Sequence, residues 1–287
     1  MSRTVLVTDS TASLSPELAE EWGIVVVPLQ VVIGATSYDE GADGATPTLV
    51  AEALREFRPV STSRPPPAAM LEVYEQAASE GATAVVSVHI SGDMSGTFES
   101  AQLAGRDASI PVVPVDSRQV GISTGFAVLA AADVLDAGGS PDEAALAARS
   151  RADATTSLFY VDTLEYLRRG GRIGAAAALL GGALAVKPLL SITDGRVATL
   201  EKVRTSGRAL SRLEELAVAS ADEDQVDVGV AHLASAERAG QLAERVAERL
   251  AHNLGGREIY CGEVGAVLGA HVGPGMIAVC VAPRRDA

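Results

Sequence analysis

The hydrophobic pattern of the chain predicts alternating strands and helices in its first half. Short valine-rich runs are followed by stretches in which apolar residues recur every three or four positions, a pattern typical of βαβ units around a mostly parallel sheet. The predicted strands cover 3–8, 24–33, 83–88 and 112–115. The predicted helices cover 15–22, 47–57, 66–80, 98–105, 121–137 and 141–153.

The pattern changes near residue 155. Asp194-Gly195 separates two apolar runs, 189–192 and 197–200, which indicates a β-hairpin and therefore antiparallel pairing. The other predicted elements are strands at 158–161, 226–231, 257–263 and 276–282 and helices at 206–220 and 235–253. At 287 residues the chain exceeds the usual size of one domain. We therefore predict an α/β fold of two α/β domains, 1–155 with a mostly parallel sheet flanked by helices and 156–287 of mixed type, with a ligand cleft between them.

Composition and charge narrow the class of ligand. Hydrophobic residues make up 47% of the chain and aromatic residues only 3%, so the core consists mainly of alanine, valine and leucine. The net charge of −14 repels phosphate backbones and anionic membrane surfaces, which excludes nucleic acid as a partner. The four histidines and two cysteines are scattered, so we predict buried free thiols, no metal site and no cofactor.

The uncharged stretch 173–186 is shorter than the roughly 20 residues that span a bilayer, so we expect no stable insertion into a membrane. It is compatible with an ordinary buried helix, or with a wall of small side chains that leaves room for an apolar ligand. At the N-terminus, Asp9 interrupts the apolar run before it reaches the length of a signal peptide. We therefore expect a cytoplasmic protein.

Several predicted strands end in loops rich in hydroxyl groups. The apolar run from Ala84 stops at Ser91, and a glycine- and hydroxyl-rich loop leads through Ser95-Gly96-Thr97 into a helix. Such a loop offers free backbone N–H groups to an anion, although it lacks the lysine of a P-loop. Similar loops begin at Asp9, Ser61, Asp116 and Gly269, and in an α/β sheet these ends converge on one crevice. The alternative is that Ser95, Thr97, Thr62 and Ser63 only cap helices.

The chain resembles the DegV family of bacterial fatty-acid-binding proteins over nearly its whole length. The matching motifs are Thr8-Asp9-Ser10-Thr11-Ala12, Thr62-Ser63-Arg64-Pro65, Ser95-Gly96-Thr97, Leu164-Glu165-Tyr166-Leu167 with Gly170-Gly171-Arg172-Ile173-Gly174, Lys187-Pro188, Glu201-Lys202-Val203-Arg204, and His271 with Gly273-Pro274-Gly275. The resemblance implies that a long-chain fatty acid such as palmitate is bound with its tail buried. Its carboxylate would contact Thr62 and Ser95, with His271 as a third contact and with Ser63 and the N–H groups around Gly96 completing the site.

The resemblance also implies a partner, an ATP-dependent fatty-acid kinase that phosphorylates the carboxylate presented by the carrier. Arg172, Lys202 and Arg204 would then hold the phosphate or the partner; the alternative is a solvated basic rim. Three positions depart from the family pattern: Pro66 and Val272 each replace a hydroxyl residue, and Asp93 adds a carboxylate near the proposed anion. We expect these three changes to alter the affinity of the site for the ligand's carboxylate.

Two other functions fit parts of the sequence. Ser95 as nucleophile, His271 as base and Asp9 or Asp116 as orienting acid would form a serine hydrolase, although Ser95 does not lie in a G-x-S-x-G turn. A related α/β fold that binds a sugar or a ketone would instead need a polar cleft, against which the apolar run 173–186 argues.

Overall fold

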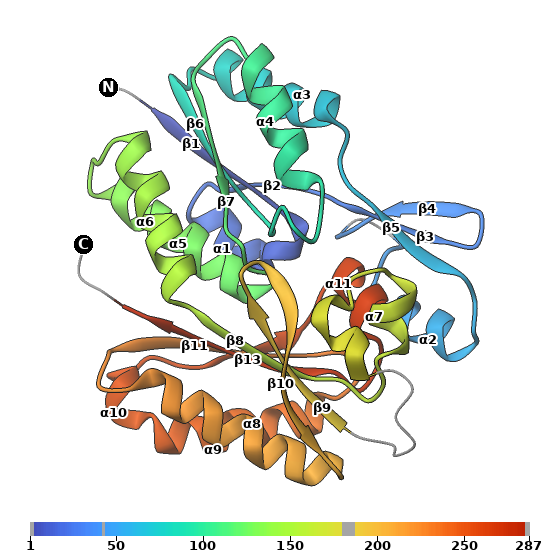
Figure 1. The fold of residues 1–287 in the computed structure, drawn as a ribbon. Helices are drawn as coiled ribbons and strands as arrows, with labels where there is room; N and C mark the ends of the chain where they lie inside the picture. Colours follow the sequence, from blue (N-terminus) through green and yellow to red (C-terminus); the bar gives the residue numbers. More distant parts are fainter. Residues whose placement is uncertain (1–2, 42–43, 180–186, 285–287) are drawn as a thin grey trace.

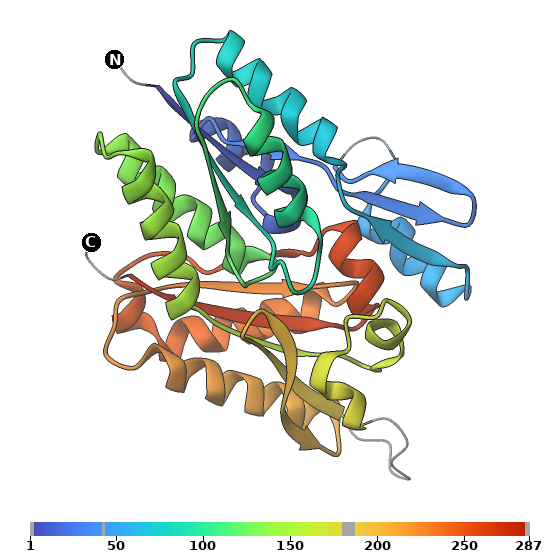
Figure 2. The same ribbon diagram turned by 45° about the horizontal axis from the view of Figure 1, so that its top comes forward.

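The computed structural model describes residues 3–41, 44–179 and 187–284, in which the strands form a parallel sheet, a larger mixed sheet and a small antiparallel sheet (Figure 1). The parallel sheet has the order β2 (Val25–Val27), β1 (Thr4–Asp9), β6 (Ala84–His89) and β7 (Val112–Asp116). Helices cover both of its faces, as Figures 1 and 2 show, so the predicted βα alternation is confirmed.

The central strands β1 and β6 are buried on both sides, because their successive side chains point to opposite faces and helices cover each face. Val5, Val7 and Val85 pack in one hydrophobic cluster with residues of α3 (Pro67–Ser79) and α4 (Thr97–Asp107). Leu6 and Val86 pack in another with α1 (Pro16–Glu21), α5 (Ile122–Asp136) and α6 (Pro141–Ala154).

The prediction of a single strand over residues 24–33 is wrong. It divides into β2, in the parallel sheet, and β3 (Gln30–Ile33), which pairs with β4 (Thr36–Asp39) and β5 (Val60–Ser63) in the antiparallel sheet β4-β3-β5. Pro28 lies between the two strands and has no N–H to continue a ladder. Thr62 and Ser63 therefore lie on a strand rather than in a loop, beside α2 (Pro47–Arg55).

The mixed sheet has the order β10 (Arg196–Val203), β9 (Lys187–Thr193), β8 (Thr156–Tyr160), β13 (Ile277–Pro283), β11 (Val226–His232) and β12 (Tyr260–Glu263). Only the β11–β12 pair is parallel. The predicted hairpin is confirmed: β9 and β10 pair antiparallel around Asp194 and Gly195, whose φ angles are 51° and 75°.

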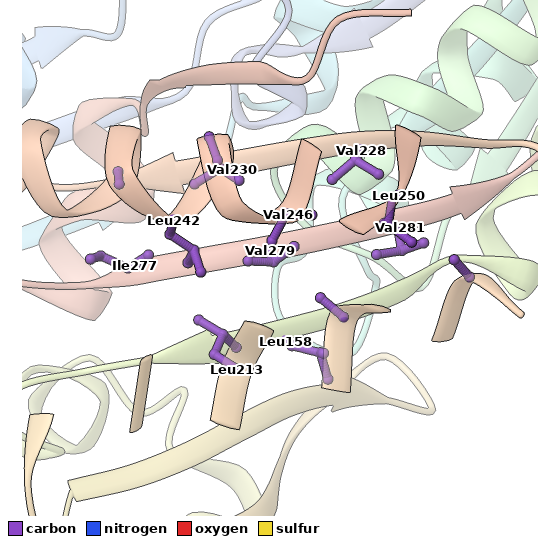
Figure 3. Close-up of a cluster of buried hydrophobic side chains, with 14 of the residues drawn as sticks. Leu158, Leu213, Val228, Val230, Leu242, Val246, Leu250, Ile277, Val279 and Val281 are labelled. Carbon is purple, nitrogen blue, oxygen red and sulfur yellow. The ribbon is translucent and has the colours of Figure 1, made fainter. Parts of the chain in front are cut away.

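One face of the mixed sheet packs against helices. Ile277, Val279 and Val281 of β13 contact α8 (Ser206–Ala221) and α9 (Ala236–Arg249) in the cluster of Figure 3. The intervening Ala278 and Cys280 point to the opposite face, toward the first half of the chain. The alternating side chains of β13 thus build both the core and the wall of the space between the halves.

Several smaller expectations need correction. The predicted helix 235–253 is interrupted at Leu250, so that α9 is followed by α10 (Ala251–Leu254). Two helices were not predicted: α7 (Glu165–Arg169) and α11 (Ala266–Val272), and α11 occupies part of the expected loop 269–275. Cys280 is a buried free thiol, but Cys261 is exposed. Short 3-10 helices, η1 (Ser10–Ala12) and η2 (Gly174–Leu179), complete the described elements.

The stretch 173–186 does not form the expected buried helix where the structure describes it. Within η2 only Ala176 is buried, and none of residues 173–179 lines the main cavity. Residues 180–186 lie outside the described part of the chain. No helix among the described residues is long and apolar enough to cross a bilayer. The α/β class with its parallel and mixed sheets is confirmed, whereas the boundary near residue 155 stays a prediction.

Candidate ligand-binding site

A cavity of about 480 Å³ lies between the parallel-sheet half and the mixed sheet. Its volume falls in the range of about 300–1,000 Å³ that is usual for small-molecule sites. Most of its wall is apolar and comes from both halves of the chain. This apolar wall includes Leu29, Ile90, Met94, Ile122, Leu158, Phe159, Leu167, Ile192, Val197, Val264, Val267, Leu268, Met276 and Ala278.

Polar side chains gather on one part of this wall. Most of them belong to Thr62, Ser63, Arg64, Ser95, Arg172 and His271, next to the backbone of Gly96, whereas Ser157 of β8 lines the cavity beside Cys280. The structure therefore brings together six of the eight predicted site residues, which come from β5, the loop before α4, the segment after α7 and α11. Lys202 and Arg204 do not line the cavity; they lie exposed at the end of β10.

Thr62 and His271 are in direct contact. The Oγ1 atom of Thr62 lies 2.8 Å from Nε2 of His271. The other ring nitrogen, Nδ1, is buried, and no group in the described ranges bonds to it. Burial, and secondarily the positive charge of Arg172, lowers the pKa of His271 from 6.5 to about 4. The imidazole is therefore neutral at pH 7, with one nitrogen committed to Thr62.

Ser95 and Gly96 lie immediately before α4. The Oγ of Ser95 lies 2.8 Å from Oγ1 of Thr97, and the N–H of Thr97 points to Ser95 Oγ at 3.4 Å. Ser95 thus has a local capping role beside its place on the cavity wall. Gly96 lies in close contact with Arg64: a Cβ there would lie 2.0 Å from Nη1 of Arg64, which donates to the Gly96 carbonyl at 2.9 Å, so a larger residue would displace this side chain.

The capping alternative fails for Thr62 and Ser63. The residue that precedes α3 is Pro66, and no side chain caps this helix. Both hydroxyls lie upstream on β5, and Thr62 bonds to His271 instead. The Thr62 hydroxyl is therefore not used to cap a helix, and it borders the cavity between the halves.

Asp93 is paired across the two halves. Its carboxylate accepts hydrogen bonds from Arg196 of β10, the shorter at 2.6 Å, and the neighbouring Ser91 hydroxyl donates to the Gly195 carbonyl at 2.7 Å. Arg172 adds a third link, from Nε to the Met94 carbonyl at 3.0 Å. The β9–β10 hairpin and the segment after α7 therefore hold the loop that carries Ser95.

A chain of fully buried, hydrogen-bonded polar side chains supports the start of the loop that carries Ser95. Asp9 lies 2.9 Å from His89 Nδ1, His89 Nε2 lies 2.7 Å from the Ser87 hydroxyl, and that hydroxyl lies 2.8 Å from Tyr74. Asp9 also accepts a hydrogen bond of 3.1 Å from the N–H of Ile90, the residue after β6. This network fixes where the loop begins.

These contacts do not assemble a hydrolase triad. The carboxylate of Asp9 is bonded to His89, and Asp116 accepts from the N–H groups of Gly92 and Arg118. His271 has no carboxylate on either ring nitrogen among the described residues. The base therefore lacks the orienting acid that the triad requires. The described part of the chain also contains no cluster of three or more His, Cys, Asp or Glu side chains able to hold a metal ion.

Sequence reasoning did not find the whole site. It missed Glu40, whose buried carboxylate contacts α11, and the apolar wall contributed by Ile122, Phe159 and Ile192. No local motif marks these residues. The alternation of β8 and β9 indicated which side chains share a face, but not that this face meets the first half.

Comparison with known proteins agrees with the fold. The model of the DegV family, described as uncharacterised protein, matches residues 3–284. A DegV domain-containing protein from Streptomyces coelicolor is 50% identical, covering 99% of this chain and 100% of the relative. A fatty-acid-binding DegV family protein from Thermus thermophilus superposes with a TM-score of 0.91 at 33% identity, covering 98% of this chain and 100% of that one.

The fatty-acid-binding protein DegV from Bacillus subtilis superposes with a TM-score of 0.90 at 32% identity, covering 99% of this chain and 100% of that one. These similarities extend over both halves of the molecule, including β5, the loop before α4 and α11, and are not limited to one sheet. The chain described here is a member of the DegV family.

Proposed function

We propose that this protein binds a long-chain fatty acid, such as palmitate, in the cavity between its halves, with the carboxylate at Thr62, Ser95 and His271. One observation carries the proposal: a largely apolar cavity has most of its polar side chains on one part of its wall, while the exception, Ser157, is hydrogen-bonded to Ser123 and Gln119. A sugar or ketone site would need polar groups distributed around the ligand. The fatty-acid-binding relatives from Thermus thermophilus and Bacillus subtilis support the same ligand class.

The hydrogen-bonding capacity of the polar groups favours a carboxylate. If the neutral His271 carries its proton on Nε2, it donates to Thr62 Oγ1, and the Thr62 hydroxyl is free to donate to the ligand. The opposite tautomer would bury an N–H at Nδ1 with no acceptor among the described residues, and buried N–H groups without an acceptor are rare in proteins. The hydroxyls of Thr62 and Ser95 would then supply donors, as a carboxylate requires.

The two ends of the ligand contribute differently to binding. A buried methylene contributes about 0.8 kcal/mol, so the tail of palmitate gains roughly 12 kcal/mol before the costs of association and ordering. A hydrogen bond to a charged group adds about 1.5–3 kcal/mol. The tail therefore supplies most of the affinity, and the head group determines the orientation.

We further propose that the bound fatty acid is presented to an ATP-dependent kinase. The kinase would bring nucleotide and magnesium and transfer the γ-phosphoryl group to a carboxylate oxygen, leaving ADP. Exposed Arg172, on the cavity wall, supports a role in holding this phosphate, and Lys202 and Arg204 offer further exposed positive charge for the partner. If acyl-phosphate formation is the same for the Arg172→Ala/Arg204→Ala variant as for an Arg149→Ala control, this role is excluded.

The binding proposal is tested by extracting the purified, undenatured protein with organic solvent and analysing the extract by mass spectrometry. We expect a stoichiometric long-chain fatty acid, which is lost from a Thr62→Ala/Ser95→Ala variant. An empty extract together with no uptake of added palmitate would contradict the proposal. In that case, labelling of Ser95 by a fluorophosphonate would test the hydrolase alternative.

A further inference from the structure

Helix α11 carries His271 but has no capping side chain of its own. Its first residue, Ala266, is preceded by Gly265. Glycine has no side chain that could accept a hydrogen bond from the free N–H groups of the first turn. The missing acceptor comes from the other half of the chain. The Oε1 atom of Glu40, which follows β4, accepts a hydrogen bond of 2.7 Å from the N–H of Val267.

Glu40 and the start of α11 are fitted closely to each other. Glu40 is only 8% exposed although it is a carboxylate. A Cβ added to Gly265 would lie 2.2 Å from Glu40 Oε1, so no larger residue fits there while the carboxylate keeps its place. Since Gly265 has a φ of −60°, its requirement comes from this contact and not from backbone strain.

The capped residue and His271 belong to one face of the helix. Val267 and His271 are four positions apart, which is about one helical turn, and both line the main cavity. A shift of the first turn therefore moves the imidazole relative to Thr62. In a helix of seven residues there is little remaining structure to absorb such a shift.

We propose that Glu40 is a positioning residue for carboxylate recognition: by capping α11 from the opposite half, it holds His271 against Thr62 and so orients the Thr62 hydroxyl toward the ligand. The inference rests on the proposed binding of a fatty acid. It assigns to Glu40 an effect mainly on the head group, because elements other than α11 build the apolar wall apart from Val267, Leu268 and Val272.

The test compares palmitate with methyl palmitate, which has the same tail but no carboxylate. In the wild type we expect palmitate to bind more tightly than the ester. In Glu40→Ala the dissociation constant of palmitate should rise about tenfold, whereas that of the ester stays nearly unchanged. Glu40→Gln, which keeps an acceptor for the Val267 N–H, should restore most of the preference. Glu52→Ala, at an exposed glutamate of α2, is the matched control.

The Gly265→Ala variant tests the same contact by changing the other residue that takes part in it. The added methyl group should displace the Glu40 carboxylate and reduce the preference for palmitate even though Glu40 is present. In a Glu40→Ala background it should have little further effect, because the atom it would strike is gone. This non-additivity is the signature of direct contact.

The outcomes separate the two proposals. If the wild type binds neither ligand, or both equally, the proposed function fails before Glu40 is considered. If the wild type prefers palmitate and both Glu40→Ala and Gly265→Ala keep that preference, the positioning role is wrong. An equal loss of acid and ester binding would also overturn it, since Glu40 would then support the cavity as a whole. Should Glu40→Ala fail to fold, Gly265→Ala and Glu40→Gln still decide the question.

Discussion

Thr62 and His271, which are 209 residues apart in the sequence, lie with Oγ1 and Nε2 2.8 Å from each other. Thr62 belongs to the small antiparallel sheet and His271 to α11, so this contact joins the two halves of the chain at the polar part of the cavity wall. The Thr62 hydroxyl is thus positioned by His271 and borders the cavity.

Replacing Thr62 by valine should weaken palmitate binding about thirtyfold. Valine keeps the branched shape and the β5 backbone but removes the hydroxyl, with a loss of about 2 kcal/mol. Thr62→Ser should keep most of the affinity because it retains the oxygen. Dissociation constants from titration calorimetry check both variants; equal affinities for Thr62→Val and wild type would place the carboxylate elsewhere.

Folding stability should depend on the protonation of His271. Its pKa is lowered in the folded state, from 6.5 to about 4, so the unfolded chain binds the proton more tightly. The contribution of His271 is therefore complete above about pH 6.5 and is lost as the pH falls toward 4. Lowering a pKa by one corresponds to about 1.4 kcal/mol of free energy. Urea unfolding of wild type and His271→Gln at pH 7 and pH 5 should show a smaller pH effect in the variant; identical differences would contradict the assignment.

Arg196 should protect ligand binding from the charge of Asp93. Both residues line a depression that also includes Ser95 and Gly96, and Arg196→Ala would leave the Asp93 carboxylate unpaired beside them. Because the pair is exposed, we expect palmitate affinity to fall only about twofold to fivefold, and less at high salt. The Arg196→Ala/Asp93→Asn variant should recover wild-type affinity. If it binds as weakly as Arg196→Ala, the loss comes from the hairpin contact and not from charge.

Ala278→Leu should shorten the acyl chain that fits. Ala278 points from β13 into the cavity, and a larger side chain takes space from the tail without touching Thr62 or Ser95. Palmitate should lose roughly fourfold in affinity for each methylene that is displaced, whereas dodecanoate changes little. A uniform loss across chain lengths would show that Ala278 does not border the tail.

Asp9→Ala should destabilise the fold by about 3–5 kcal/mol, since removal of one partner from a buried pair leaves the other uncompensated. Asp9 and His89 are both fully buried, and the N–H of Ile90 would lose its acceptor as well. Asp136→Ala, at an exposed position, should change the free energy of unfolding by less than about 0.5 kcal/mol. Chemical denaturation measures both, and similar values would refute the role of the network.

Local pattern determined most of the secondary structure. Short valine-rich runs predicted β1, β6, β7 and β11, apolar residues recurring every three or four positions predicted α3, α5, α6 and α8, and Asp194-Gly195 predicted the β9–β10 hairpin. These elements depend on side-chain alternation and turn chemistry, both of which act over a few residues. The hydroxyl-rich and glycine-rich loops marked the regions of Thr62, Ser95 and His271, and the resemblance to the DegV family singled out these three residues.

Only the tertiary structure decided how these pieces meet. It split the run 24–33 between two sheets and turned the expected loop around His271 into α11, because the stability of a helix of seven residues comes from packing rather than from propensity. It also placed Glu40 at the start of that helix and the apolar faces of β8, β9 and β13 around one cavity. Contacts between residues more than 200 positions apart leave no periodic trace in one sequence, so the chemistry of the site was readable but its geometry was not.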